Sequence, residues 1–177
     1  MQGILYIFDT LATLYNYALL LRLIMQLSRA DFRNPVSRGI VQLTDPVIRP
    51  LRRVLPPAGR IDTASVVAVL LFAAVKLWLL QALAGYAAIM PFALLRATLL
   101  EVAHLVLKTY FFSIILNAIL SFVAPGNYSP AQSLLASICD PVLNPIRRVI
   151  PSIAGLDLSP LWALIAIQAL LIVLPVA

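Results

Sequence analysis

The sequence has few charged residues. Only 11% of its 177 residues are Asp, Glu, Lys or Arg, against about 25% in an ordinary soluble domain, and 62% are hydrophobic. A chain so poor in charge cannot cover a globule with polar surface, which excludes a soluble domain and indicates a membrane protein. The charges present are unbalanced, with 13 Lys and Arg against 7 Asp and Glu. In a membrane protein this excess is typical of segments held beside anionic lipid headgroups, so we expect the bilayer itself to be one partner.

Cysteine and histidine are scarcer still, with Cys139 and His104 the single residue of each type. One cysteine excludes an internal disulfide, and one cysteine with one histidine excludes a Cys/His metal cluster of standard spacing. No nucleophile accompanies the imidazole in a triad pattern, and no Gly-rich phosphate loop is present. We therefore predict no enzymatic activity and no cofactor or metal, with haem bound through His104 as a minor alternative. No aromatic–basic pattern of a recognised kind is present either, so we expect no nucleic-acid partner.

What the sequence does contain is one segment written twice. Asp45 to Pro56 recurs 95 residues later as Asp140 to Pro151, with an Asp, three prolines and an Arg pair at identical spacing. The repeated positions are Asp45, Pro46, Pro50, Arg52, Arg53 and Pro56 in the first copy, and Asp140, Pro141, Pro145, Arg147, Arg148 and Pro151 in the second. A repeat of this length indicates a tandem duplication.

Apolar runs flank both copies, at about residues 4–27, 63–90, 97–123 and 159–177. A membrane crossing needs about 20 apolar residues, so we predict an all-α membrane protein with four transmembrane helices. They form two direct repeats, residues 1–90 and 93–177, each ordered as helix, amphipathic segment, basic proline turn and helix. Asn34 and Ser129, each before a proline, predict the starts of the amphipathic segments. Asp45 and Asp140 are expected to cap further helix starts, and the prolines to prevent one long helix.

The duplicated segment is the first candidate site. The two motif loops hold nine arginines, seven in the first and two in the second, which predicts cytoplasmic loops and both termini outside. On one hypothesis the repeated Asp-Pro and Arg-Arg positions bind a membrane or cytoplasmic protein partner. On the other they are structural, with arginines that hold lipid phosphate. The sequence leaves both open, and with them the oligomeric state.

The second candidate site comprises four ionisable residues inside the apolar runs, where unpaired charge is expensive: Lys76, Glu101, His104 and Lys108. The last three lie at i, i+3 and i+7, on one helical face. Lys76 and Glu101 enter from opposite sides, so a pair near mid-membrane is geometrically possible. A proton or cation relay is the functional alternative, and a structural ion pair or snorkelling lysines the other. Arg22, near the end of the first run, is also expected to snorkel to the interface.

The duplicated D-P-x-x-x-P-x-R-R-x-x-P motif, with Asp62 or Asp157 opening the next apolar run, resembles the YggT family, also called YlmG. The resemblance covers nearly the whole chain. It implies a multi-pass protein of the bacterial inner membrane without established enzymatic activity, related to osmotic-stress tolerance and cation homeostasis, and in plastid relatives to the assembly of membrane cytochrome complexes. We therefore expect an assembly or envelope-maintenance factor that acts through the duplicated motif. A small cation-handling protein that uses Lys76, Glu101, His104 and Lys108 is the alternative.

Overall fold

The computed structural model describes residues 2–57, 62–85, 90–123, 129–150 and 157–175. These residues form six helices and no strand, which confirms the predicted all-α class. The helices are α1 (Gln2–Leu27), α2 (Pro35–Val54), α3 (Thr63–Leu83), α4 (Pro91–Val123), α5 (Pro130–Val149) and α6 (Ser159–Val173).

Three of these helices are long and apolar enough to cross a membrane. They are α1, α3 and α4, with 26, 21 and 33 residues. The fourth predicted crossing corresponds to α6, which is apolar but has only 15 residues, below the roughly 20 that a crossing needs. The described part of the chain is therefore that of a helical membrane protein with at least three candidate spans.

The amphipathic helices α2 and α5 begin where the sequence predicts. The side chain of Asn34 accepts a hydrogen bond from the backbone N–H of Val36 at 2.9 Å. Ser129 accepts one from the N–H of Gln132 at 3.1 Å. Each cap satisfies one of the N–H groups that the first turn of a helix leaves without a partner.

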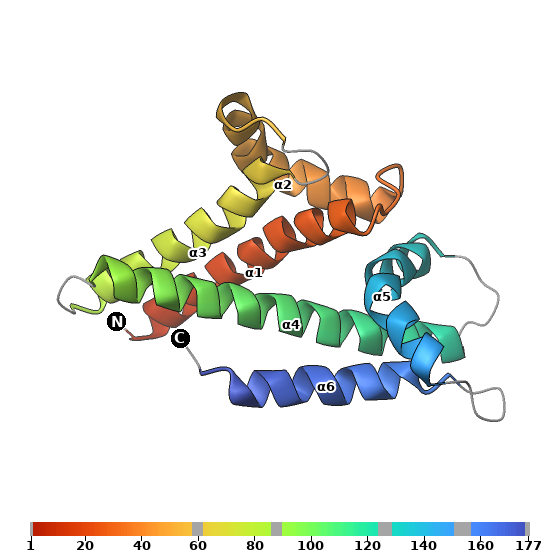
Figure 1. Ribbon diagram of the computed structural model, residues 1–177. Coiled ribbons are helices and arrows are strands. Elements are labelled where there is room, and N and C mark those ends of the chain that lie inside the picture. The colour runs from red at the N-terminus through yellow and green to blue at the C-terminus, as the bar shows by residue number, and fades with distance from the viewer. Residues whose placement is uncertain (1, 58–61, 86–89, 124–128, 151–156, 176–177) are drawn as a thin grey trace.

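The prediction of a proline turn after each amphipathic segment is wrong. Pro46 and Pro50 lie inside α2, and Pro141 and Pro145 lie inside α5. A proline removes the hydrogen bond to the residue four positions earlier, and each pair of prolines is itself four residues apart. The missing bonds therefore fall on one stripe of the helix, so the helix bends instead of ending. Figure 1 shows α2 and α5 changing direction along their length.

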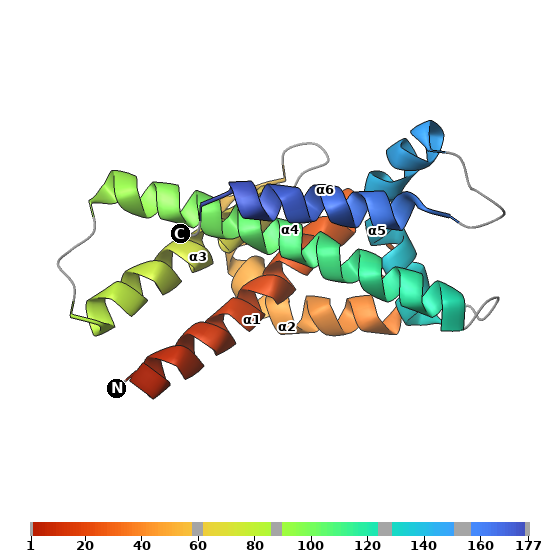
Figure 2. The ribbon, with the colours of Figure 1, turned by 90° about the horizontal axis from the view of Figure 1, so that it is seen from below.

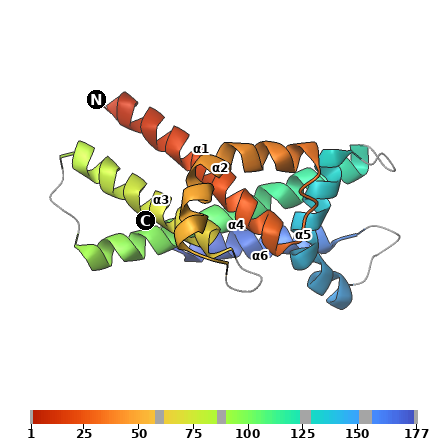
Figure 3. The same ribbon diagram turned by 90° about the horizontal axis from the view of Figure 1, so that it is seen from above.

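The six helices are arranged with α2 and α5 toward one end of the molecule. The start of α1 lies toward the other end, as do the last turn of α3 and the first turn of α4 (Figures 1 and 3). α1 packs against α2 and α3, and α4 packs against α3, α5 and α6. α1 also contacts α4, and the two amphipathic helices contact each other. Figure 2 shows α6 running alongside α4.

Two clusters of buried side chains form the core. The larger one includes Leu19 and Met25 of α1, Ile48 of α2 and Ile138 of α5. The smaller one joins α4, α5 and α6 through Ile114, Cys139, Leu143, Ala163 and Ile167. The amphipathic helices thus bury one face against the long helices, which leaves their arginine-bearing face available at one end of the molecule.

Candidate functional sites

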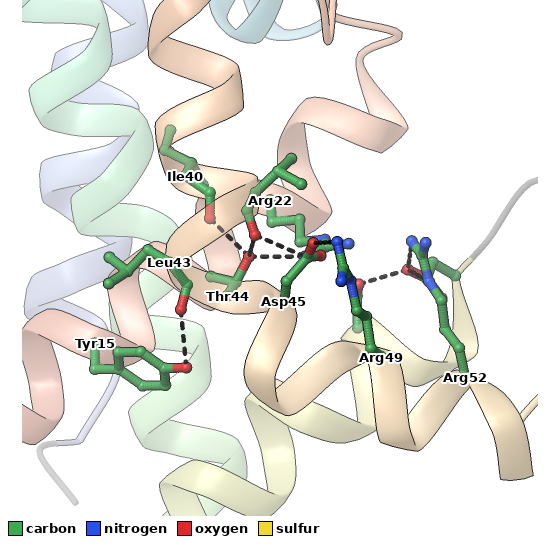
Figure 4. Close-up of polar contacts among 11 residues, drawn as sticks. Tyr15, Arg22, Ile40, Leu43, Thr44, Asp45, Arg49 and Arg52 are labelled. Atoms are coloured by element: carbon green, nitrogen blue, oxygen red, sulfur yellow. Dashed lines mark hydrogen bonds and ion pairs between the residues drawn. The ribbon is translucent and has the colours of Figure 1, made fainter.

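Arg22 joins α1 to the middle of α2. Only 4% of Arg22 is exposed, and its Nη1 donates to Oδ1 of Asp45 at 2.8 Å, to Oγ1 of Thr44 at 2.9 Å and to the carbonyl of Val41 at 3.3 Å. Figure 4 shows Arg22 and Asp45 reaching toward each other across this contact. The expectation that Arg22 snorkels is therefore wrong, because α2 provides it with a buried partner.

Asp45 is a partner for arginines and does not cap a helix. It lies in the interior of α2, where its Oδ2 also accepts from Nη2 of Arg49 at 2.6 Å. Burial alone would raise the pKa of Asp45, but the hydrogen bond and charge of Arg22 and the charge of Arg49 lower it below its ordinary value. Asp45 is thus a carboxylate at neutral pH, and the predicted capping role is wrong for it and for Asp140, which lies inside α5.

The first arginine of the duplicated pair joins each amphipathic helix to the helix that follows. Nε of Arg52 donates to Oδ2 of Asp62, immediately before α3, at 3.1 Å. Nε of Arg147 donates to Oδ2 of Asp157, just before α6, at 2.9 Å. Burial raises the pKa of each Asp, but hydrogen bonds from these arginines and from nearby serines lower it more. The same ion pair therefore occurs twice, at positions 95 residues apart.

The two copies differ in what the motif aspartate contacts. The residues 95 positions after Arg22 and Arg49 are Asn117 and Asn144. Asp140 therefore lacks the two partners of Asp45 and instead accepts from Nη1 of Arg147 at 3.3 Å. The side chain of Asp140 is 49% exposed, against 15% for Asp45. Only the first repeat has a buried arginine between its long helix and its amphipathic helix.

The second arginine of each pair has no comparable contact. Arg53 and Arg148 are exposed, and among residues 2–57, 62–85, 90–123, 129–150 and 157–175 neither forms an ion pair or a side-chain hydrogen bond. Of the remaining motif residues, Pro56 accepts a hydrogen bond at its carbonyl from the Thr63 hydroxyl at 2.7 Å. Pro151 lies outside the described residues. Arg53 and Arg148 are therefore the arginines of the two pairs whose side chains are open to another molecule.

Two of the four ionisable residues of the apolar runs, Lys76 and Glu101, form a charged cluster with Asp9 between three helices. Lys76 of α3 is 5% exposed, and its Nζ contacts the carboxylate of Glu101 from α4. The same Nζ lies 3.0 Å from Oδ1 of Asp9 and 3.0 Å from Oγ1 of Thr13, both from α1. The structure therefore brings Lys76 and Glu101 together, a pair that the sequence allows, and adds a second carboxylate from Asp9.

A cavity of about 330 Å³ opens beside this cluster. Its lining consists of Asp9, Thr13, Tyr17, Glu101, His104, Leu105 and Lys108. Nδ1 of His104 lies 3.0 Å from the carbonyl oxygen of Leu100. Because a carbonyl oxygen can only accept, a neutral imidazole carries its proton on Nδ1 in this contact, and its Nε2 is then an acceptor. In the described ranges, no three His, Cys, Asp or Glu side chains are close enough together to hold a metal ion.

Asp9 and Thr13 are two polar residues of the cavity that the sequence did not single out as site residues. A signal for them existed, because Asp9 lies 95 residues before His104, and Thr13 lies 95 residues before Lys108. The cavity is therefore lined from α1 and α4 by residues at equivalent positions of the duplication. Their chemistry differs, with Asp opposite His and Thr opposite Lys.

These features define a helical integral membrane protein with an internally duplicated motif. The family model described as CCB3/YggT matches residues 1–83 and 96–177. The chain belongs to the CCB3/YggT family, which confirms the predicted resemblance. Within it, the chain is 45% identical to an uncharacterized protein of Pseudomonas aeruginosa, over 93% of this chain and 84% of the relative.

Two further relatives have similar coverage. The chain is 36% identical to the uncharacterized protein YggT of Escherichia coli K12, over 91% of this chain and 83% of the relative. It is 37% identical to an uncharacterized protein in the proC 3' region of Vibrio alginolyticus, over 95% of this chain and 91% of the relative. No solved structure matches the chain.

Proposed function

We propose that the protein is a non-enzymatic interaction factor of the bacterial inner membrane, with four crossings built as two direct repeats. The repeat is supported by equivalent packing, since α1 contacts α2 and α3 as α4 contacts α5 and α6. α6 is the fourth crossing, and its 15 residues span about 22 Å, a mismatch that local thinning of the bilayer accommodates. The arginine-rich helices α2 and α5 lie on the cytoplasmic side, with both termini outside.

The observation that carries the proposal is that the two arginines of each pair have different surroundings. Arg52 and Arg147 are engaged with Asp62 and Asp157, whereas Arg53 and Arg148 are exposed at the ends of α2 and α5. A guanidinium that holds no intramolecular partner is available for a carboxylate or phosphate of another molecule. Two such groups at equivalent positions provide two similar contacts for an acidic segment of an assembly or envelope-maintenance partner.

Site-specific crosslinking tests this proposal. Cysteines replace Arg53 and Arg148 in a Cys139→Ser background, and the captured species are identified by mass spectrometry. We expect one protein with an acidic segment at both positions, and no capture of it from a control cysteine at Arg38, an exposed arginine in the first half of α2. Capture of lipid alone, or equal capture from the control, would reject a specific docking role.

A matched pair of substitutions separates docking from folding. Arg53→Gln with Arg148→Gln is expected to abolish partner capture and leave membrane insertion and stability unchanged. Arg52→Gln with Arg147→Gln breaks the contacts to Asp62 and Asp157, so it is expected to lower stability. If the exposed pair can be replaced without any loss of co-purification, the interaction hypothesis fails.

The charged cavity favours a second candidate function, cation handling. Two carboxylates, Asp9 and Glu101, meet one buried Lys76 beside a cavity that His104 and Lys108 also line. Ionisable side chains buried within membrane-spanning helices are rare and commonly mark substrate, ion or proton pathways. A cation or proton that replaces the Lys76 ammonium at Glu101 would find oxygen ligands already in place.

Flux across proteoliposome membranes tests this candidate. Wild type is expected to carry a potassium or proton flux that Glu101→Gln reduces. Asp31→Asn is the control, because Asp31 is an exposed carboxylate remote from the cavity in sequence and absent from its lining. A wild-type protein that carries no flux would remove this candidate and leave the cluster as a structural ion pair.

A further inference from the structure

An apolar groove lies between the two repeats and has no role in either proposed function. Its volume is about 470 Å³, within the range of about 300–1,000 Å³ that small-molecule sites occupy. The long helices α1 and α4 and the amphipathic helices α2 and α5 all contribute to its lining. Tyr17 lines both this groove and the charged cavity, so the two spaces meet at one side chain.

The groove follows the relation between the two repeats. Four pairs of its lining residues are separated by 95 positions: Tyr17 and Phe112, Leu21 and Leu116, Val36 and Ala131, and Ile40 and Leu135. Equivalent faces of the repeats therefore meet around it, and both amphipathic helices contribute to its lining. Leu116 and Val36 are 50% and 42% exposed, so the groove is open to its surroundings, which for α1 and α4 are lipid.

The surrounding charge indicates which lipid would enter. The segment that leads into α2 and the first half of that helix carry Arg29, Arg33 and Arg38, all exposed. None forms an ion pair within the described part of the chain. Val36 and Ile40 line the groove from one face of α2, which places Arg38, two residues from each, on the opposite face, whereas Arg33 lies just before the start of the helix. The apolar lining, with the unpaired guanidinium group of Arg33 at the start of α2, matches an acyl chain joined to a phosphate-bearing, anionic headgroup.

We propose that the groove between the repeats binds an acyl chain of an anionic phospholipid from the leaflet in which α2 and α5 lie. The chain occupies the space between Leu116, Ile40 and Ala131, and the headgroup lies beside Arg33, next to where α2 and α5 begin. Position 128, equivalent to Arg33 in the second repeat, is a tyrosine, so the headgroup selects the first-repeat side. The lipid would hold α2 and α5 together where Asn34 donates to Oγ of Ser133 at 3.3 Å.

Native mass spectrometry of the full-length protein tests the proposal. The protein is purified in mild detergent and supplied with phosphatidylglycerol and phosphatidylcholine of identical acyl chains. We expect wild type to retain phosphatidylglycerol in preference to phosphatidylcholine. Ala131→Trp, which fills the groove, should lose the bound lipid, whereas Leu71→Trp should keep it, because Leu71 is 52% exposed on α3 and outside the groove.

Further variants and a second probe keep the test decisive. Arg33→Gln is expected to retain lipid but lose the preference for phosphatidylglycerol, whereas Arg38→Gln should keep that preference, because Arg38 lies on the face of α2 opposite the groove residues. A phosphatidylglycerol with a photoreactive acyl chain should label wild type at groove residues of α4 and α5, which needs no variant to fold. Lipid retained equally by Ala131→Trp, no preference between the two lipids, or labelling spread over α3 and α6 would overturn the proposal. So would disulfide crosslinking of two chains through a cysteine at Leu116, because a second copy would then occupy the groove.

Discussion

Asp45 and Asp140 occupy the same position of the duplicated motif, yet their removal should have very different effects on stability. The Arg22 and Asp45 side chains are 5% and 15% exposed and meet at 2.8 Å. Breaking such a buried pair by removing one charge costs about 3–5 kcal/mol. Arg22 would keep its bonds to Thr44 and Val41, so we expect Asp45→Asn to lose about 3 kcal/mol, the lower end of that range.

Asp140→Asn provides the matched control. The side chains of Asp140 and Arg147 are 49% and 39% exposed, and exposed pairs contribute about 0–1 kcal/mol. Arg147 also keeps Asp157 when Asp140 is replaced. Reversible unfolding in mixed micelles of mild detergent and dodecyl sulfate measures both variants. Equal losses of stability for the two substitutions would refute the burial argument.

A double substitution tests whether the loss comes from an unpaired charge. Arg22→Met with Asp45→Asn removes both charges, so no buried ion remains without a partner. Because the Arg22 charge is no longer left buried without its carboxylate, the double variant should be more stable than Asp45→Asn alone. A double variant as unstable as the sum of the two single variants would show that the pair is not coupled.

Two further predictions concern the ends of the helices. The hydrogen bond from Arg52 holds the pKa of Asp62 in the folded protein below the unfolded value of about 3.9. The ionised Asp62 therefore stabilises the fold above about pH 3.9, and this stabilisation is lost as the pH falls through the folded pKa. The unfolding free energies of wild type and Asp62→Asn should therefore differ at pH 7 and converge in acid; a difference independent of pH would contradict this. Ser129→Ala should lose about 1 kcal/mol because the N–H of Gln132 loses its acceptor, whereas Ser137→Ala, in the interior of α5, should lose less than about 0.5 kcal/mol. Thermal unfolding of the two alanine variants measures this difference, and equal losses would contradict the capping role of Ser129.

The sequence predicts the long helices well because their signal is local. A run of about 20 apolar residues suffices to predict a crossing, and α1, α3 and α4 each contain one. The caps at Asn34 and Ser129 are local too, since a side chain and an N–H within three residues decide them. The short α6 shows the limit of this signal, because the apolar composition continues beyond the last helical residue at Val173.

The prolines misled the prediction because their effect depends on context. One interior proline costs a helix about 3 kcal/mol, which would end an isolated amphipathic helix. In α2 tertiary packing offsets that cost, because Ile48, between Pro46 and Pro50, is fully buried in the core. Such packing lies outside any local pattern. This error also affected the prediction for Arg22. Its partner Asp45 is in place only because α2 continues through the prolines.

The duplication divides the polar contacts into two kinds. The ties from Arg52 to Asp62 and from Arg147 to Asp157 are complete within each repeat, so each repeat can anchor its own amphipathic helix. The charged cavity is different, because Asp9 and His104 occupy equivalent positions but meet only where α1 faces α4. Lys76 also has no charged counterpart, since the residue 95 positions on is Leu171. A fragment containing one repeat is therefore expected to keep its arginine tie and lose the cavity, so any activity of that cavity belongs to the whole chain.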